Sequence, residues 1–232
     1  MIDVSISYGF TEDNKYKLEE IPTKIQLAIY KYKLYEENKK YILEKLEGKI
    51  NVRVVHLPLD TMKTDSKLIF KMMDEIYART GCEKYIIHPN KGIQEFVDDF
   101  IRSGMPVMLC VETFNWRRHK VYRSPLDIIE AIVTLPNVWM TLDTTHIEDI
   151  WFDHRIMGFL LKYTKVIHLS NRANGIGEHL PFNHPNGVLP LVRFVRDLKY
   201  QYKWGGDIVL EYKTAYHDKL IKNLHYVESL LK

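Results

Sequence analysis

Six short apolar segments of the sequence each end at a side chain that can bind a metal ion. The segments read VRVVHL, YIIH, VMLCVE, VWMTLD, KVIHL and DIVLE. Their metal-binding residues are His56, His88, Glu112, Asp143, His168 and Glu211. An unpaired buried charge costs several kcal/mol, so a β-strand core does not tolerate this many ionisable groups without a reason. A shared cation is the simplest reason.

The spacing of these six residues predicts that they meet. Successive residues are 32, 24, 31, 25 and 43 positions apart, close to one strand plus one returning helix each. A right-handed β-α repeat brings every strand end to the same face of a parallel sheet. Mixed carboxylates and imidazoles suit Mn, Zn, Fe or Co better than Mg or Ca, which prefer oxygen ligands. Bridging carboxylates would allow a dinuclear site, so we expect one or two ions per chain.

The elements that must position these residues alternate along the whole chain. Apolar alternation predicts strands at 2–7, 25–29, 51–57, 84–88, 106–112, 137–142, 165–169 and 207–211. Helical spacing and glycine stops predict helices at 35–47, 67–79, 92–103, 125–134, 149–163, 188–202 and 217–231. Eight strands close a (β/α)8 TIM barrel, an α/β fold, as a single domain over residues 1–232. Only a polar stretch separates the first two strands, so the first helix is expected to be shortened.

Composition agrees with an enzyme-sized cytoplasmic domain. The 232 residues are 46% hydrophobic and carry a formal charge of +3, which favours neither a nucleic acid nor a membrane partner. With only Cys82 and Cys110, a disulfide framework is excluded and a reducing compartment is expected. The N-terminus MIDVSISYGF lacks the features of a signal peptide, and no apolar run approaches the length of a membrane span.

Two loops bring further candidate ligands to the same end of the predicted barrel. His146 follows Asp143 by three residues, and Glu178 and His179 lie in a long polar loop at 170–186. In barrels of this type the active site lies at the carboxyl ends of the strands, where all of these residues are expected.

These motifs together resemble the xylose isomerase-like TIM-barrel superfamily, which includes the sugar phosphate isomerases and epimerases and the endonuclease IV family of AP endonucleases. The similarity spans about residues 50–215. Asp143-Thr144-Thr145-His146 is similar to the D-T-x-H motif of the superfamily, and His168-Leu169-Ser170-Asn171 to its H-L-x-D/N motif. The loop from His179-Leu180-Pro181 to Asn186-Gly187-Val188 resembles the H-x-P-x-G-x-G loop of many isomerase-like members. The remaining strand-end positions are matched by His56, His88-Pro89, Glu112 and Glu211.

The resemblance implies roles for these residues. It implies one metal ion held by Glu112, Asp143, His168 and Glu211. In the isomerases the two glutamates also move a proton at a carbon beside a metal-bound carbonyl and hydroxyl. In the endonuclease branch further zinc ions are bound, and the corresponding histidines here are His56, His88, His146 and His179. One departure concerns the third zinc site: Gly177 stands where that branch has an aspartate.

Two residues outside the metal set are candidates for substrate binding. Arg172 lies in the loop after His168 and could hold a phosphate or hydroxyl group, although a surface arginine is the slightly favoured alternative. Trp116 lies in the loop after Glu112 and could cover the mouth of the barrel or belong to a solvated loop.

Three functions are compatible with these observations. We expect first a divalent-metal-dependent isomerase or epimerase in which Glu112 and Glu211 transfer a proton on a small sugar, sugar phosphate or hydroxy-keto acid. The alternative is a zinc phosphodiesterase resembling endonuclease IV, which acts at abasic sites; DNA is a partner only in this case. The third is a metal-binding barrel without catalysis, which the presence of both glutamates disfavours. The oligomeric state stays open.

Overall fold

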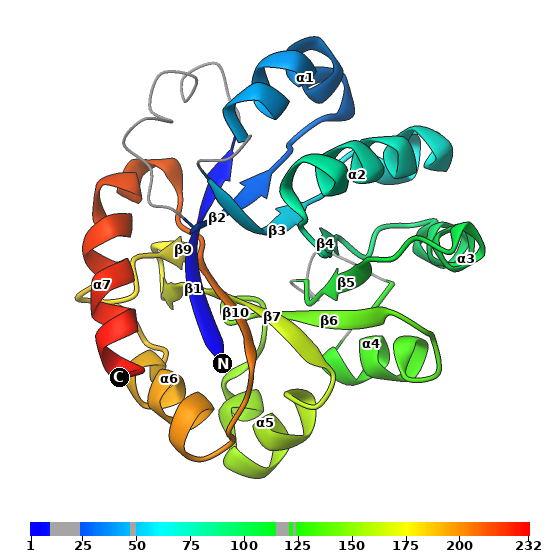
Figure 1. Cartoon of the computed structure of the whole chain (residues 1–232). Coiled ribbons are helices and arrows are strands. Elements are labelled where there is room, and N and C mark those ends of the chain that lie inside the picture. Colours follow the sequence, from blue (N-terminus) through cyan, green and yellow to red (C-terminus); the bar gives the residue numbers. More distant parts are fainter. Residues whose placement is uncertain (10–23, 47–49, 115–120, 123) are drawn as a thin grey trace.

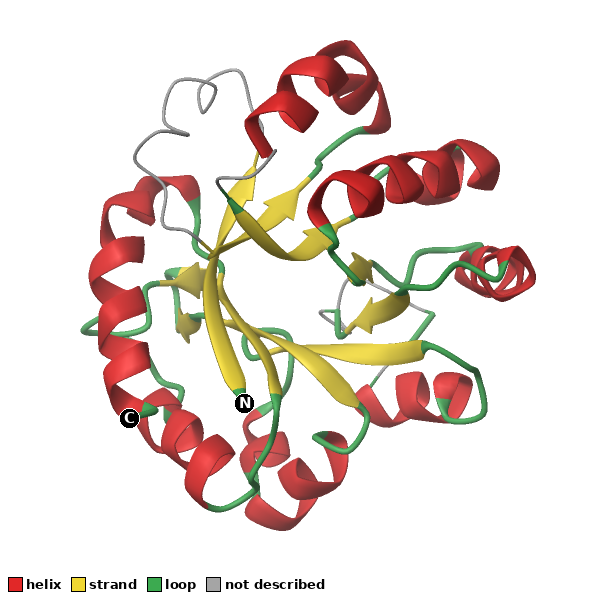
Figure 2. Ribbon diagram, in the orientation of Figure 1, coloured by secondary structure: helices red, strands yellow, loops and turns green. Residues whose placement is uncertain are grey.

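Eight parallel strands form a closed barrel, and helices surround it (Figures 1 and 2). The computed structural model describes residues 1–9, 24–46, 50–114, 121–122 and 124–232. Around the barrel the strands follow the order β1-β10-β7-β6-β5-β4-β3-β2, so the first and last barrel strands pair and no edge is left. The predicted (β/α)8 TIM barrel is confirmed. The shortened first helix was predicted within residues 10–23, which lie outside the described residues.

The strand boundaries lie within two residues of those predicted from alternation. The barrel strands are β1 (Ile2–Gly9), β2 (Lys24–Ala28), β3 (Asn51–His56), β4 (Lys84–Ile87), β5 (Met108–Glu112), β6 (Val138–Asp143), β7 (Thr164–Leu169) and β10 (Gly206–Leu210). The described α-helices are α1 (Tyr32–Leu46), α2 (Ser66–Thr80), α3 (Ile93–Ser103), α4 (Pro125–Ile132), α5 (His154–Leu160), α6 (Leu191–Tyr200) and α7 (Leu220–Leu230). Short 3-10 helices occupy η3 (Thr61–Lys63), η4 (Asp149–Phe152) and η5 (Thr214–Lys219).

Four predictions in the second half of the chain were wrong in detail. The helix expected at 149–163 is divided, because Asp153 leaves the helical conformation and its carboxylate caps α5 by accepting from two backbone N–H groups. The helices expected at 188–202 and 217–231 begin later, at Leu191 after Pro190 and at Leu220 after η5. The loop expected at 170–186 contains a small antiparallel hairpin, formed by β8 (Asn171–Ala173) and β9 (Gly177–Leu180).

The interior of the barrel is filled in layers, because alternate residues of each strand point inward. The middle layer is apolar and consists of Val54, Ile86, Cys110, Val166 and Val209, all buried. A larger apolar core lies outside the strands, between the barrel and its helices. Two residues further along the strands, the inward positions carry the imidazoles and carboxylates predicted from the sequence. The apolar layer therefore forms the floor of the site.

A network of ion pairs closes the opposite end of the barrel, where the strands begin. The carboxylate of Asp207, which is 1% exposed, lies 3.0 Å from Arg53 Nε and 2.6 Å from Lys84 Nζ. Asp3 bonds both Arg53 and Lys24, at 2.9 and 2.6 Å. Each cation thus has a counter-charge, which allows charged groups to enter the end of a protein core.

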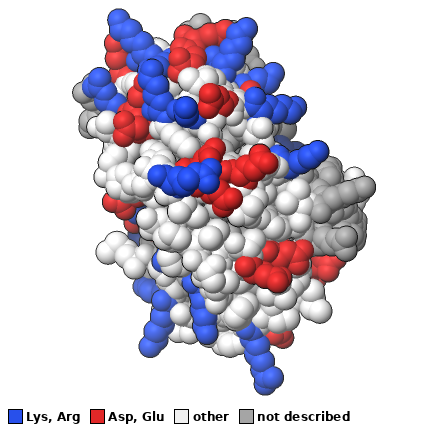
Figure 3. All heavy atoms as spheres, turned by 90° about the vertical axis from the view of Figure 1, so that its right-hand side faces the viewer, with Lys and Arg blue, Asp and Glu red and all other residues white. Residues whose placement is uncertain are grey.

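No helix among the described residues is long and apolar enough to cross a membrane. On the face formed by α2, α3 and α4, basic and acidic side chains are intermingled around an uncharged area (Figure 3). This face has no continuous basic surface.

We expect the Asp207→Asn variant to lower the free energy of unfolding by about 2–4 kcal/mol, because it leaves Arg53 and Lys84 near the core with less counter-charge. Chemical denaturation of the variant and the wild type measures the change. Asp218→Asn removes an exposed carboxylate that pairs with Lys219 and should change stability by less than about 0.5 kcal/mol. Equal effects of the two substitutions would contradict a structural role for the Asp207 network.

Candidate metal centre

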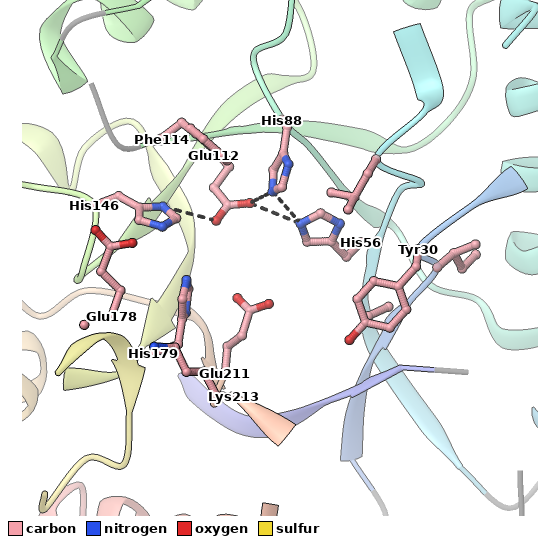
Figure 4. Close-up of a pocket in the computed structure, with 14 residues that line it drawn as sticks. Tyr30, His56, His88, Glu112, Phe114, His146, Glu178, His179, Glu211 and Lys213 are labelled. Atoms are coloured by element: carbon pink, nitrogen blue, oxygen red, sulfur yellow. Dashed lines mark hydrogen bonds and ion pairs between the residues drawn. The ribbon is translucent and has the colours of Figure 1, made fainter. Parts of the chain in front are cut away.

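The six strand-end residues predicted from the sequence converge at one end of the barrel. Figure 4 shows four of them, His56, His88, Glu112 and Glu211. Three barrel strands end at such a residue: β3 at His56, β5 at Glu112 and β6 at Asp143. His168 is the second-last residue of β7. His88 follows β4 directly, and Glu211 follows β10. The parallel register of the barrel places them together, since Asp143 pairs with His168 and Ile86 with Cys110 in neighbouring strands.

The central group contains the four residues implied to hold one ion. One donor atom from each of Glu112, Asp143, His168 and Glu211 lies within 4.8 Å of the others. His168 Nδ1 is 3.1 Å from Glu112 Oε1 and 2.7 Å from Glu211 Oε2. Three carboxylates and one imidazole in so small a volume need positive charge, which a cation between them or protonated imidazoles can supply.

Hydrogen bonds determine which nitrogen of His168 faces this group. Nε2 lies 2.8 Å from the Gln26 side-chain oxygen, and the Gln26 amide nitrogen donates to Ser7. Because the amide oxygen can only accept, His168 Nε2 donates to it, and Nδ1 is the ring nitrogen that faces the carboxylates. Such a contact through the second nitrogen orients a metal-binding histidine.

A second group of donors adjoins the first and shares Glu112. Glu112 Oε2 lies 3.1 Å from His56 Nε2 and 3.0 Å from His88 Nε2. The two imidazole nitrogens are 3.2 Å apart. His56 Nδ1 donates to the Leu57 carbonyl at 2.9 Å, so His56 Nε2 is the ring nitrogen that faces Glu112 and His88. Two ring nitrogens and an oxygen thus face one point.

A third group shares Asp143 with the central one. It consists of Asp143, His146 and His179. His146 Nδ1 lies 3.0 Å from the Thr113 carbonyl, to which it donates, so His146 Nε2 is the ring nitrogen left to bind an ion. Asp143 Oδ1 accepts two hydrogen bonds from Thr145, but Asp143 Oδ2 is buried and accepts none.

The hairpin after β7 brings His179 to this group. Gly177 and His179 both have positive φ angles, 117° and 55°, in the region that favours glycine. His179 in this conformation is strained, at a cost of about 1 kcal/mol. Its Nε2 then lies 4.0 Å from Asp143 Oδ2, and its ring contacts that of His146 edge-on.

The charges of these groups depend strongly on one another. Burial alone would raise the pKa of Glu112, but His168 and His88 hold it well below its ordinary value. Burial would also raise the pKa of Glu211, but His168 lowers it to about 2. Burial would lower the pKa of His168, but Glu211 and Glu112 raise it well above its ordinary value. Without a metal ion, protonated imidazoles therefore supply the charge that balances the carboxylates.

The donor set fits divalent cations. Asp143 Oδ2 is a buried acceptor without a hydrogen bond, and the outer hydrogen bonds of three histidines direct the second ring nitrogen of each one inward. Nitrogen and carboxylate ligands together are typical of zinc, manganese, iron or cobalt sites.

The donors open into a cavity of about 460 Å³ (Figure 4). Its lining includes residues that the sequence did not single out, namely Ala28, Ile29, Tyr30, Leu59, Phe114 and Lys213. Gly177 and the candidate ligand Glu178 also line the cavity, and Glu178 lies near His146 (Figure 4). Burial, followed by the nearby Glu211 carboxylate, raises the pKa of Tyr30.

Of the two substrate-binding candidates, the structure describes only Arg172. Arg172 does not line this cavity; its guanidinium donates to the carbonyls of Thr145 and Ile147 and pairs with Asp149. These contacts tie the loop after β7 to the loop after β6, so the geometry gives Arg172 a structural role. Trp116 lies outside the described residues.

Comparison with known proteins agrees with this architecture. No family model matches the chain. The chain is 26% identical over 203 residues to a probable endonuclease 4 from Mycoplasmopsis agalactiae, with 75% of this chain and 73% of the relative covered. A 3-keto-D-glucoside 4-epimerase from E. coli has a similar structure, with a TM-score of 0.64, 12% identity and coverage of 99% and 100%. A xylose isomerase domain protein from Salmonella typhimurium aligns with a TM-score of 0.58 and 15% identity over 98% and 96% of the two chains. The chain has the xylose isomerase-like TIM-barrel fold.

The TTHB071 protein from Thermus thermophilus, whose crystals were soaked with ZnCl2, aligns with a TM-score of 0.63 and 16% identity over 98% and 97% of the chains. At these identities the structural neighbours establish the fold alone. The resemblance inferred from the motifs is thus confirmed, and the chemistry must be argued from the site.

We expect metal binding at neutral pH to release protons. The raised pKa of His168 means that its imidazole is protonated before an ion arrives, whereas Glu112 and Glu211 have already lost their protons. Affinity should therefore fall as the pH is lowered, because protons and metal compete for His168 Nδ1. Calorimetric Zn²⁺ titrations in two buffers of different ionisation enthalpy measure the released protons. A heat that is independent of the buffer would contradict this.

Proposed function

We propose that the protein is a metal-dependent enzyme that hydrolyses phosphate ester bonds by a centre of two or more ions. The observation that carries this proposal is the sharing of carboxylates. Glu112 belongs to both the first and second donor groups, and Asp143 to both the first and third. Carboxylates shared in this way are what a bridged multinuclear centre requires, and such centres are typical of phosphatases and nucleases.

The residues would divide the work as follows. Glu112, Asp143, His168 and Glu211 would hold one ion, and His56 and His88 would hold a second together with Glu112. When bound, the ions would supply Lewis acidity and a nucleophile at neutral pH. Gln26, Leu57 and Thr113 orient the inward nitrogens of His168, His56 and His146 toward the ions by accepting from the outer nitrogens. The similarity to a probable endonuclease 4 supports the same class of reaction.

The surroundings of Glu112 disfavour proton transfer by its carboxylate. Both oxygens of this carboxylate contact imidazoles, Oε2 those of His56 and His88 and Oε1 that of His168. Glu112 is also buried. A general base must reach the substrate proton, and a carboxylate held by three imidazoles is better placed to bridge ions.

An isomerase or epimerase is the second candidate, because one observation favours it. Glu112 and Glu211 face the same cavity, which has the volume of a small-molecule site, and both contact His168 Nδ1. A sugar bound to a single ion at the four central residues could exchange a C–H proton with one of these glutamates. The sugar epimerases among the structural neighbours support this possibility at the level of the fold.

The His88→Gln variant separates the two functions. His88 belongs to the donor group with His56 and Glu112 but not to the central four, so a hydrolase should lose one ion and at least about 100-fold in turnover. An isomerase that uses the central ion alone should keep most of its activity. His225→Gln is a matched control, because His225 is exposed on α7.

The activities are measured on bis(4-nitrophenyl) phosphate and on an abasic-site duplex, with metal content determined by mass spectrometry. Deuterium uptake from D₂O by a panel of sugars and sugar phosphates tests the second candidate. Deuterium uptake without phosphate ester cleavage would reject hydrolysis and establish the isomerase.

A further inference from the structure

The cavity has a cationic side that the metal-binding residues do not explain. Lys213 follows Glu211 by two residues and lines the cavity. Its backbone N–H donates to the His179 carbonyl at 3.0 Å, which fixes the end of β10 against the hairpin. Its Nζ lies 2.9 Å from the point where a Cβ on Gly177 would stand. The absence of a side chain at Gly177 thus leaves room for this ammonium group beside the third donor group.

The charge of Lys213 is available to a ligand. Within the described part of the chain, no ion pair includes this lysine. A lysine ammonium is a compact point charge that suits phosphate. A neutral sugar offers no group of opposite charge. The cationic side of the cavity therefore favours an anionic substrate.

The other side of the cavity is apolar and exposed. Tyr30 is 42% exposed and Leu59 is 50% exposed, and both line the cavity with Ala28 and Ile29. The Leu59 N–H donates to the Tyr30 carbonyl at 3.2 Å, which holds these two residues next to each other. In Figure 4 the Tyr30 ring stands across the cavity from His146.

The position of the Tyr30 ring depends on Gly9. A Cβ on Gly9 would lie 2.3 Å from Tyr30 Cε2, so a side chain at this position would displace the ring. The ring therefore packs directly on the backbone of β1. An aromatic side chain held in this way provides a flat contact surface at little entropic cost.

We infer that the cavity binds a small phosphate ester, with Lys213 holding the phosphate group and Tyr30 and Leu59 contacting its planar or apolar substituent. The inference rests on the proposed function and names its substrate class. A cavity of about 460 Å³ accepts a molecule of this size. The ester oxygen would then lie between the lysine and the donor groups.

Binding is tested on the metal-loaded protein with phenyl phosphate, methyl phosphate and phenol, by calorimetry. We expect phenyl phosphate to bind more tightly than methyl phosphate and phenol to bind weakly. Lys213→Met should weaken both phosphates about tenfold or more and leave phenol and the metal content unchanged. Lys213→Arg should restore most of the affinity. Lys219→Met, which removes an exposed lysine on η5, should have no effect.

A variant of Tyr30 tests the contact with the phenyl group. Tyr30→Leu should remove the preference for phenyl over methyl phosphate while methyl phosphate binds as before. Tyr200→Leu replaces an exposed tyrosine on α6 and serves as the control. Thermal melting of each variant verifies that it is folded.

Unchanged phosphate affinity in a folded, metal-loaded Lys213→Met variant would overturn the inference, as would equal affinity of the wild type for phenyl and methyl phosphate. Failure of the proposed function looks different. In that case the phosphates bind in a Lys213-dependent manner but no phosphate ester is cleaved, and the binding site stands without the hydrolase. Cleavage that is indifferent to Lys213 would leave the hydrolase and reject the site.

Discussion

The burial of the Glu112 carboxylate at the end of β5 is the constraint on which the rest of the site depends. This group is 1% exposed, and a carboxylate so far from water is stable only with partners of positive charge or strong donors. Three imidazoles supply them, from β3, from the residue after β4 and from β7. The closed barrel makes this possible, because its register brings the side chains at distant strand ends to hydrogen-bond distance of one another. In a metal-loaded site, Glu112 and these imidazoles would contact the bound cations in place of one another.

The hydrogen bonds to the outer nitrogens of the histidines determine how the imidazoles are presented. A histidine that binds metal must keep one nitrogen unprotonated, and here the other nitrogen is committed to an acceptor in each of three cases. Gln26 on β2 performs this role for His168, and backbone carbonyls perform it for His56 and His146. Gln26 is itself oriented by Ser7 on β1. The first two strands carry none of the six strand-end ligands, yet they determine how the central imidazole is presented.

The sequence was sufficient to predict the fold and the cluster of candidate metal-binding residues, and the reason is physical. An ionisable residue at the end of an apolar strand has few explanations, and the βα period then places all six together. Lys213 and Tyr30 could not be identified in this way, because a lysine or tyrosine in a loop is normally solvated. Their positions arise from tertiary contacts, such as Tyr30 on Gly9 and Lys213 beside Gly177. For Arg172 the sequence left a ligand contact and a surface position open, and in the structure its guanidinium joins two loops.

The choice between proton transfer and hydrolysis then depends on what surrounds each glutamate. An epimerase needs two carboxylates that reach a carbon atom, and the Glu211 side chain, 26% exposed at the cavity, has that freedom. Glu112 does not, because imidazoles engage both of its oxygens. Two more imidazoles, His146 and His179, adjoin Asp143 in the same cavity, although proton transfer by paired glutamates does not require them. Imidazoles are costly to bury and to orient, and His179 is held in a strained backbone conformation to reach its place. The four histidines outside the central group are therefore best explained by additional ions, which is the arrangement that phosphate ester chemistry uses.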